Sequence, residues 1–457
     1  MRSDINKPVW LGACAAGIAV CAALNQGVLH PLWVRNYAPK NLSVSSGLAP
    51  DQMLLALAGF REMVASILWV RADTYFDQGN YDAVLPIIRM VTWLDPKQID
   101  VYSTGMWHIG YNFTDEQSRS DRRYLPSALA LGAEGAKNNS ETYEMYFETG
   151  WMWFHKINDQ YDNAVTWFEK ASEKSDIPPA RRNMLSSAYQ RAGQLDKALK
   201  LYYDQLNKAE ISMKEQLDQV TAFTARQQRD TVEKNLDVFL VRMSQRGNFN
   251  ADGTATELFD TQPPFDVGFS AEVSVIDAAV LRVRATWNVR PVGTRIRVIL
   301  RDADYPNGTD AGMDFGASDS VNLDPPKNLT FMQDELFIRN RRADKKMDMS
   351  RDPTMYTFSK DKYYLDFYYN PRSAPPHIQD RFGFLGEGMT DKNYLNTTAR
   401  NGERVIFHRM ELTRDMLKRE GEWIDKMPIL RTPNFIEGSS TRTGEEELIK
   451  VPGLLNK

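Results

Sequence analysis

The sequence predicts a multidomain protein with an N-terminal transmembrane helix, an all-α solenoid of repeated helix pairs and a C-terminal antiparallel β-rich, sandwich-like domain. Three observations support this prediction. Residues 9–24 carry no charge, residues 51–247 show helical periodicity with a recurring motif, and apolar and polar residues alternate after about residue 265. The change of period from 3.6 to 2 separates the helical domain from the β-rich one.

The composition excludes several classes of function. The chain has 457 residues and a net charge of −4, so no global basic field favours nucleic acid. Both cysteines lie in the apolar N-terminal stretch, which excludes disulfides and thiolate chemistry from the rest of the chain. The histidines have no metal-ligand spacing, and there is no phosphate-binding loop, nucleophile elbow or dinucleotide fingerprint. We therefore predict no catalytic residues and no enzymatic activity.

Residues 1–34 are predicted to form a cytoplasmic tip and a membrane anchor. The uncharged stretch and the apolar residues that follow it up to Val34 supply the roughly 20 residues of a spanning helix. No clean small-residue cleavage site precedes a polar start, which favours a retained anchor over a cleaved signal peptide or a lipidated cysteine. Residues 35–50 form a polar linker. We expect a single-pass protein whose bulk lies outside the cytoplasm.

The helical region 51–247 contains a repeat. Residues 185–206, LSSAYQRAGQLDKALKLYYDQL, predict two amphipathic helices hinged at Gly193, and residues 160–171 show the same pattern 34 residues earlier. One helix pair is too small to bury its own apolar face, so pairs must stack. A small residue lets the second helix approach the first, and an aromatic residue fills the gap to the next pair. The predicted packing residues are Ala72, Tyr75, Gly105, Ala164, Phe168, Ala171, Tyr189, Gly193, Ala198 and Tyr202.

The 34-residue period, with a small residue followed four positions later by an aromatic one, resembles the tetratricopeptide repeat. Three units are recognisable and one, from about residue 101 to 136, is degenerate. Residues 57–96 and the following GMWHIGYNFT resemble a group of bacterial, membrane-anchored tetratricopeptide proteins. This resemblance implies an architecture and a setting in the bacterial inner membrane and periplasm. It implies no reaction.

The resemblance also implies a binding groove for protein partners. In a tetratricopeptide array the groove is lined by the first helix of each unit, and aromatic and amide side chains there hold a peptide by stacking and hydrogen bonding. An insertion in the turn of the unit around residue 150 shifts its alignment by one residue. Aligning the units places in the groove Trp69, Asp73, Tyr102, Met106, Glu148, His155, Asn183 and Gln190. The alternative is that Trp69 and Tyr102 are core residues of imperfect repeats.

The β-rich domain is predicted over residues 262–437, followed by a flexible tail, 438–457. Residues 281–289 and 295–301 alternate between apolar and charged side chains and predict a β-hairpin with a row of exposed arginines. Residues 363–370 and 404–412 predict further strands, and residues 413–424 a helix capped by Thr413. One hypothesis is that the arginines bind an acidic glycan, a phosphate or an acidic partner. The alternative is that they only keep the edge of a soluble sheet from pairing with other strands.

No cofactor is predicted apart from a calcium hypothesis. Carboxylate and amide oxygens around a glycine suit Ca²⁺, and residues 301–324 offer such donors at Asp302, Asp304, Asn307 and Asp310. The spacing departs from that of an EF-hand loop, and the same residue types dominate ordinary turns.

These features lead to two hypotheses on function. The first is a membrane-tethered scaffold or adaptor that binds protein partners of an envelope complex through the groove and the β-rich domain. The alternative is an envelope polysaccharide-binding protein, or a hydrolase or transferase, that acts through the β-rich domain.

Overall fold

The computed structural model describes residues 60–435 with internal gaps, the longest of which are 247–266, 305–328 and 421–428. The predicted anchor, linker and C-terminal tail lie outside the described residues. The chain divides into two compact units, residues 1–90 and 91–457. A helical region is followed by an antiparallel sheet region, which confirms this part of the predicted fold class. Among the described helices, none combines the length and apolarity needed to cross a bilayer.

The first described helix pair is α4 (Arg61–Asp77) and α5 (Tyr81–Leu94). The turn between them contains Gly79 with a φ of 70°, in the left-handed region that glycine adopts without strain. The buried face of α4 includes Ala72, a predicted packing residue. Pro86 lies in the second turn of α5, where its missing N–H removes one helical hydrogen bond.

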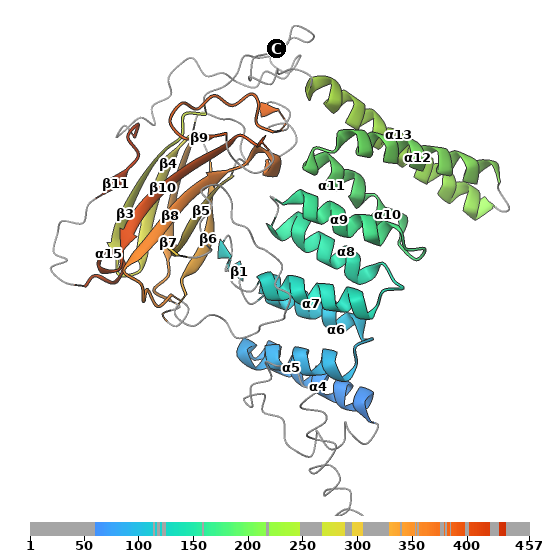
Figure 1. Ribbon diagram of the computed structural model, residues 1–457, viewed down its shortest axis with the longest axis horizontal. Helices are drawn as coiled ribbons and strands as arrows, with labels where there is room; N and C mark the ends of the chain where they lie inside the picture. Colours follow the sequence, from blue (N-terminus) through green and yellow to red (C-terminus); the bar gives the residue numbers. More distant parts are fainter. Residues whose placement is uncertain are drawn as a thin grey trace, which may run out of the picture. The chain divides into compact units, whose positions relative to one another are not determined.

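The helices of the second unit follow one another in chain order, and each packs on its neighbour in sequence (Figure 1). This is the contact pattern of stacked helix pairs. The elements are α6 (Ile99–Trp107), α7 (Leu125–Asn138), α8 (Glu144–Trp151), α9 (Tyr161–Ser172), α10 (Pro179–Arg182), α11 (Met184–Ala192), α12 (Leu195–Lys214) and α13 (Gln219–Arg246). Two first helices continue as π-helical segments, η3 (His108–Asn112) after α6 and η5 (Met152–Ile157) after α8.

Small residues lie where helices approach one another closely. A β-carbon added to Gly150 of α8 would lie 2.7 Å from Cδ1 of Phe168 on α9. A β-carbon added to Gly135 of α7 would lie 2.8 Å from the ring of Tyr102. The predicted packing residues of this unit are buried at Gly105, Ala164, Phe168, Ala171, Tyr189, Ala198 and Tyr202.

The hinge predicted at Gly193 is present. Gly193 follows α11 with a φ of 79°, and the amide of Gln194 donates to the carbonyl of Tyr189 at 2.9 Å. This is a left-handed helix end that glycine favours. On the other side of α12, the Tyr202 ring packs against Phe239 of α13 at a centroid distance of 5.4 Å.

Two antiparallel sheets form the C-terminal region. In the described residues one sheet has the order β11-β3-β4-β7 and the other the order β1-β2-β6-β5-β8-β10-β9. The strands of the first are β3 (Ser270–Asp277), β4 (Val280–Thr286), β7 (Arg342–Asp348) and β11 (Leu430–Arg431). Those of the second are β1 (Asp115–Glu116), β2 (Arg119–Ser120), β5 (Arg295–Asp302), β6 (Phe331–Phe337), β8 (Lys362–Tyr369), β9 (Leu395–Asn396) and β10 (Val405–Thr413).

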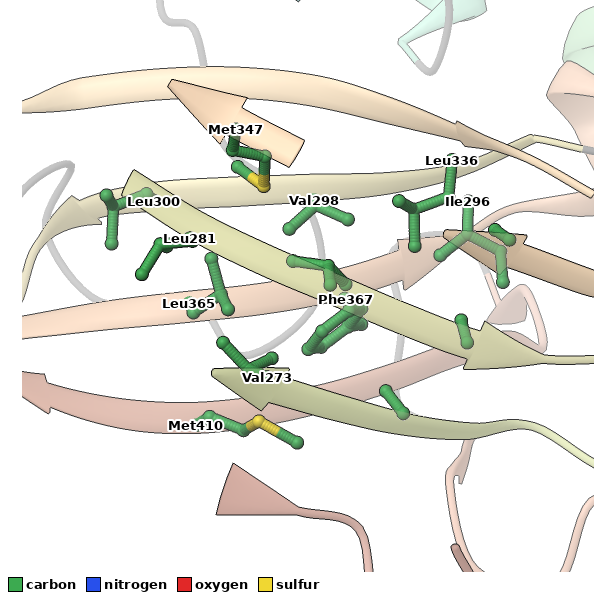
Figure 2. Close-up of a cluster of buried hydrophobic side chains, with 14 of the residues drawn as sticks. Val273, Leu281, Ile296, Val298, Leu300, Leu336, Met347, Leu365, Phe367 and Met410 are labelled. Atoms are coloured by element: carbon green, nitrogen blue, oxygen red, sulfur yellow. The ribbon is translucent and has the colours of Figure 1, made fainter. Parts of the chain in front are cut away.

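One hydrophobic core lies between the two sheets. Figure 2 shows side chains of Val273 and Leu281 from the four-stranded sheet beside those of Val298, Leu365 and Phe367 from the seven-stranded sheet. Alternation along each strand places apolar residues on this inner face. The region therefore has the aligned apolar faces of a two-layer β structure.

The predicted hairpin of residues 281–289 and 295–301 is wrong. Strand β4 pairs with β3 and β7, whereas β5 pairs with β6 and β8 in the other sheet. Alternation identifies which side chains of a strand are buried but not which strand lies beside it. Trp287, buried directly after β4, packs on Tyr369 of β8 at 4.8 Å between ring centroids, so a contact between the two sheets lies at this end of β4.

The helix predicted after Thr413 is confirmed, although it is shorter than expected. Helix α15 spans Arg414–Lys418, and the Thr413 hydroxyl accepts a hydrogen bond from the amide of Met416. This is the N-terminal cap predicted from the sequence. The helix stops at Arg419, which has a φ of 57°.

Candidate functional site

Four side chains on the first helices of two consecutive pairs form a row, which we call the aromatic row: Trp107, Tyr111, Trp151 and His155. Trp107 stacks on Tyr111 at 4.6 Å between ring centroids, with an angle of 22° between the planes. His155 stacks on Trp151 at 5.2 Å and 7°. Tyr111 and His155 join the two halves at 5.9 Å. The row is a continuous aromatic surface carried by two helices.

The two π-helical segments position this row. Trp107 is the last residue of α6 and Tyr111 lies in η3, while Trp151 is the last residue of α8 and His155 lies in η5. A π segment places one more residue in the helical turn than an α-helix does, and such segments occur often at functional sites. The same aromatic spacing of four residues therefore recurs at the same kind of junction in both helices.

Hydrogen bonds fix the row across the two helices. The Trp107 indole N–H donates to Oε2 of Glu148 at 3.2 Å. The Tyr111 hydroxyl and Nδ1 of His155 are hydrogen-bonded at 3.0 Å. Two such links 41 and 44 residues apart in the chain hold the rings in defined orientations. Ordered rings lose little conformational entropy when a ligand stacks on them.

Glu148 is the polar centre of the site. Its Oε1 accepts a hydrogen bond from Nη1 of Arg181 at 2.8 Å, and the side-chain exposure is 10% for Glu148 and 37% for Arg181. The Arg181 guanidinium lies 4.6 Å from the ring centroid of Phe147. A carboxylate, a guanidinium and an indole N–H thus meet beside the aromatic row.

A second carboxylate lies one turn before Glu148. Burial raises the pKa of the Glu144 carboxyl above its ordinary value, and the Arg181 guanidinium opposes this. The carboxylates of Asp100, Glu148 and Asp176 raise this pKa further. Several acidic groups therefore share one guanidinium at the start of these helices.

The aromatic row combines covered and exposed surface. The ammonium of Lys156, a buried side chain, lies 4.7 Å from the ring centroid of Tyr111. Trp107 is 37% exposed, His155 is exposed and Trp151 is half-buried. This surface suits stacking with a ligand, because tryptophan and tyrosine offer large apolar faces with one polar atom each.

Two of the predicted groove residues, Glu148 and His155, lie in this site. The predicted groove residues Tyr102 and Met106 do not, because they are 0% and 1% exposed between α6 and α7. Their burial corrects the groove assignment for these two positions. For Tyr102 the sequence analysis gave a core position as the alternative, and the structure places Tyr102 in the core.

Asn183 and Gln190 contribute to contacts within the helical region. The Asn183 carbonyl accepts a hydrogen bond from the Ser186 hydroxyl at 2.7 Å, at the start of α11. The Gln190 side chain donates to the Tyr202 hydroxyl at 3.1 Å and accepts from Nη1 of Arg242 at 3.2 Å. Both side chains are half-buried. Trp69 and Asp73 belong to the first unit, where Trp69 is half-buried and Asp73 exposed on α4.

The alignment of repeats did not identify Trp107, Tyr111, Asp100, Glu144 or Arg181 as site residues. The sequence contains a signal for the aromatic pairs, because Trp107 and Tyr111 have the same four-residue spacing as Trp151 and His155. Residues four apart lie on one face of a helix. Comparing the first helices for this spacing would have found the row.

The proposed calcium ligands are only partly described. Asp302 is fully buried at the end of β5, and the exposed Asp304 pairs with Nζ of Lys360 at 3.3 Å. Asn307 and Asp310 lie outside the described residues. Within the part of the chain that the structure describes, no three histidine, cysteine or acidic side chains gather as metal ligands.

The predicted row of arginines is divided between the two sheets. Arg282 pairs with Asp344 at 2.6 Å, and Arg284 pairs with Glu272, on the four-stranded sheet. Arg301 is buried on the seven-stranded sheet, where its Nε lies 3.1 Å from Oδ2 of Asp366. The single exposed ladder expected for a hairpin is therefore absent from the described strands, because β4 and β5 are not paired.

Comparisons with known proteins identify no family for this chain. No protein-family model matches the chain, and a search of curated proteins finds no match.

Proposed function

We propose that this protein is a membrane-tethered scaffold that binds a segment of a partner protein on the first-helix surface around the aromatic row. The observation that carries this proposal is the row itself, in which hydrogen bonds order the rings and Trp107 and His155 are exposed. Aromatic side chains at interfaces supply contact area at low entropic cost. Helices that stack in chain order, as in a tetratricopeptide array, offer such a surface to a peptide.

The rest of the chain has a place in this proposal. The apolar residues 9–24 would tether the protein in a bacterial inner membrane, with the helices and sheets on the periplasmic side. The two-sheet region would dock a second component of an envelope complex. The aromatic row and the carboxylates beside it support binding. We propose no catalytic step and no cofactor.

The test is the capture of partners by the full-length chain cross-linked in membranes. Trp107→Ala combined with His155→Ala removes two exposed members of the row, and we expect the captured proteins to be lost. Tyr203→Ala is the matched control, because Tyr203 is an aromatic residue of α12 that is 51% exposed. Circular dichroism should show unchanged helix content in both variants.

Two outcomes would count against the proposal. If the double variant captures the same proteins in the same amounts as the wild type, the row is not the binding surface. If Tyr203→Ala reduces capture as much as the double variant, the loss reflects general surface hydrophobicity and not this site.

A further inference from the structure

The two helices that carry the aromatic row have the same order of acidic and aromatic side chains along the chain. On α6 and η3, Asp100 precedes Trp107 and Tyr111; on α8 and η5, the acids Glu144 and Glu148 precede the aromatic pair. Acidic groups therefore lie at the beginning of both helices and aromatic groups at the end. The Trp107–Glu148 hydrogen bond joins the two kinds of group.

Several carboxylates interact at the acidic end. The carboxylates of Asp100, Glu148 and Asp176 raise the pKa of Glu144, and the Arg181 guanidinium lowers it. Arg181 is already engaged with Glu148 at 2.8 Å. A further cation at this place would reduce the repulsion among the carboxylates.

One cation of the chain already lies over the aromatic row. The Lys156 ammonium lies 4.7 Å from the Tyr111 ring centroid. A cation above an aromatic face is attracted by the ring quadrupole, most strongly by tryptophan. Trp107 is 37% exposed.

Resting on the function proposed above, we propose that the partner segment bound at the aromatic row is cationic, an extended stretch rich in arginine and lysine. Its cationic side chains stack on Trp107 and the neighbouring rings and pair with Glu144 and Asp100. Acidic residues at helix N-termini also stabilise the helix through its dipole. If the carboxylates served only this purpose, the protein would show no preference for a cationic peptide. A measurement of peptide binding therefore separates a role in binding from a role in helix stability.

The experiment measures the affinity of three fluorescent 12-residue peptides for the full-length protein in a non-ionic detergent. The peptides alternate serine with arginine, with glutamine or with glutamate. We expect the arginine peptide to bind at least about tenfold more tightly than the glutamine peptide at about 0.1 M salt, and the preference to weaken as salt screens the charges.

The variants separate the charge inference from the site itself. Glu144→Gln with Asp100→Asn should weaken the arginine peptide about fivefold to tenfold, since each exposed pair contributes modestly. Glu173→Gln, an exposed carboxylate at the end of α9, is the matched control and should leave binding unchanged. Trp107→Ala should weaken the arginine peptide as well.

Each outcome supports or overturns the inference. Equal affinity for the glutamine or glutamate peptide, with loss on Trp107→Ala, overturns the cationic partner but leaves the binding surface in place. If Glu173→Gln weakens binding of the arginine peptide as much as the Glu144→Gln and Asp100→Asn variant does, the effect comes from overall charge. This result also overturns the cationic partner. If Trp107→Ala changes neither peptide binding nor partner capture, the proposed function itself fails.

Discussion

The carboxylate of Glu148 connects three side chains whose positions define the site. It accepts hydrogen bonds from the Trp107 indole and the Arg181 guanidinium, and it is itself nearly buried. Both donors are 37% exposed, so each hydrogen bond contributes a modest net free energy. Glu148 therefore matters for the order of the row as well as for its charge.

We predict that Glu148→Ala destabilises the protein by about 0.5–1.5 kcal/mol, because the partly exposed indole N–H and guanidinium lose their shared acceptor. Urea unfolding followed by circular dichroism measures the change. Glu233→Ala is the matched control, since Glu233 forms an exposed pair with Arg229 within α13, at 2.6 Å. It should stay within about 0.5 kcal/mol. Equal effects of the two substitutions would contradict the role of Glu148.

The imidazole of His408 predicts a pH dependence of stability. Burial lowers the pKa of His408 below its ordinary value, and the Asp366 carboxylate partly opposes this. As the pH falls through the ordinary histidine pKa, the unfolded chain binds a proton at His408 before the folded chain does. The free energy of unfolding therefore decreases as the pH falls. The free energy of unfolding should fall between pH 7.5 and 5.5, and His408→Gln should reduce the fall. An unchanged slope in His408→Gln would refute this.

Aligning the first helices placed Glu148 and His155 together in the predicted groove, and the structure has both at the aromatic row. Their place in a binding groove stays a prediction. Tyr102 and Met106 were placed on the surface although they are buried, since apolar first-helix residues look alike in a degenerate unit. The π-helical segments cannot be read from one sequence, and they determine where Tyr111 points relative to α8.

At the scale of secondary-structure elements, small residues determine how closely the helices pack. Gly150 faces Phe168, and Gly132 faces Met106 and Thr149. A larger residue at such a place forces neighbouring side chains out of their rotamers. The helix interfaces of the second unit are thus specified by volume and not by polarity.

We predict that Gly150→Ala destabilises the α8–α9 interface, although alanine is the better helix former. The added β-carbon would lie 2.7 Å and 2.8 Å from Cδ1 and Cε1 of Phe168, which are ring atoms in a packed core. Overpacking costs about 1–3 kcal/mol and outweighs the gain in helix propensity of about 1 kcal/mol. Thermal unfolding measures it, with exposed Thr166→Ala on α9 as control. A rise in melting temperature for Gly150→Ala would contradict the close packing.

Strands were predictable as elements, and their partners were not. Residues 363–370 and 404–412 correspond to β8 and β10, which pair along their whole length. The alternating residues of β4 and β5 indicated two strands close in sequence, for which a hairpin is the usual arrangement. The actual partners of β4 and β5 are β3 and β7 in one sheet and β6 and β8 in the other, and periodicity does not contain such long-range pairing.

At the scale of the whole molecule, the helices of the second unit are linked to the sheets by specific contacts. The Arg191 guanidinium donates to the carbonyls of Arg372 and Ala374, the latter at 2.9 Å. Arg242 of α13 donates to Gln379 at 3.0 Å. Strand β2, from the segment between α6 and α7, pairs with β6. The segment between α6 and α7 thus contributes β1 and β2 to the seven-stranded sheet.

We predict that Arg191→Ala with Arg242→Ala uncouples the unfolding of helices and sheets. Scanning calorimetry should show a single cooperative transition of the second unit in the wild type and two separated transitions in the double variant. Each contact between a charged donor and an oxygen contributes about 1.5–3 kcal/mol when well buried. Arg226→Ala, at an exposed position of α13, is the control. Two transitions in the control as well would refute the coupling by these arginines.

The position of β11 has a consequence for the order in which the protein folds during synthesis. β3 forms its hydrogen bonds with β11 at Leu430 and Val273, and β8 with β10 at Tyr369 and Ile406. Most contacts of the helices join elements that are close in the chain, which favours early folding, whereas non-local strand pairing is slow. Until the ribosome has released residue 431, one edge of β3 lacks its partner and remains open to strands of other chains. Emerging chains of this protein would therefore depend most on chaperones after the helices have formed and before β11 has docked.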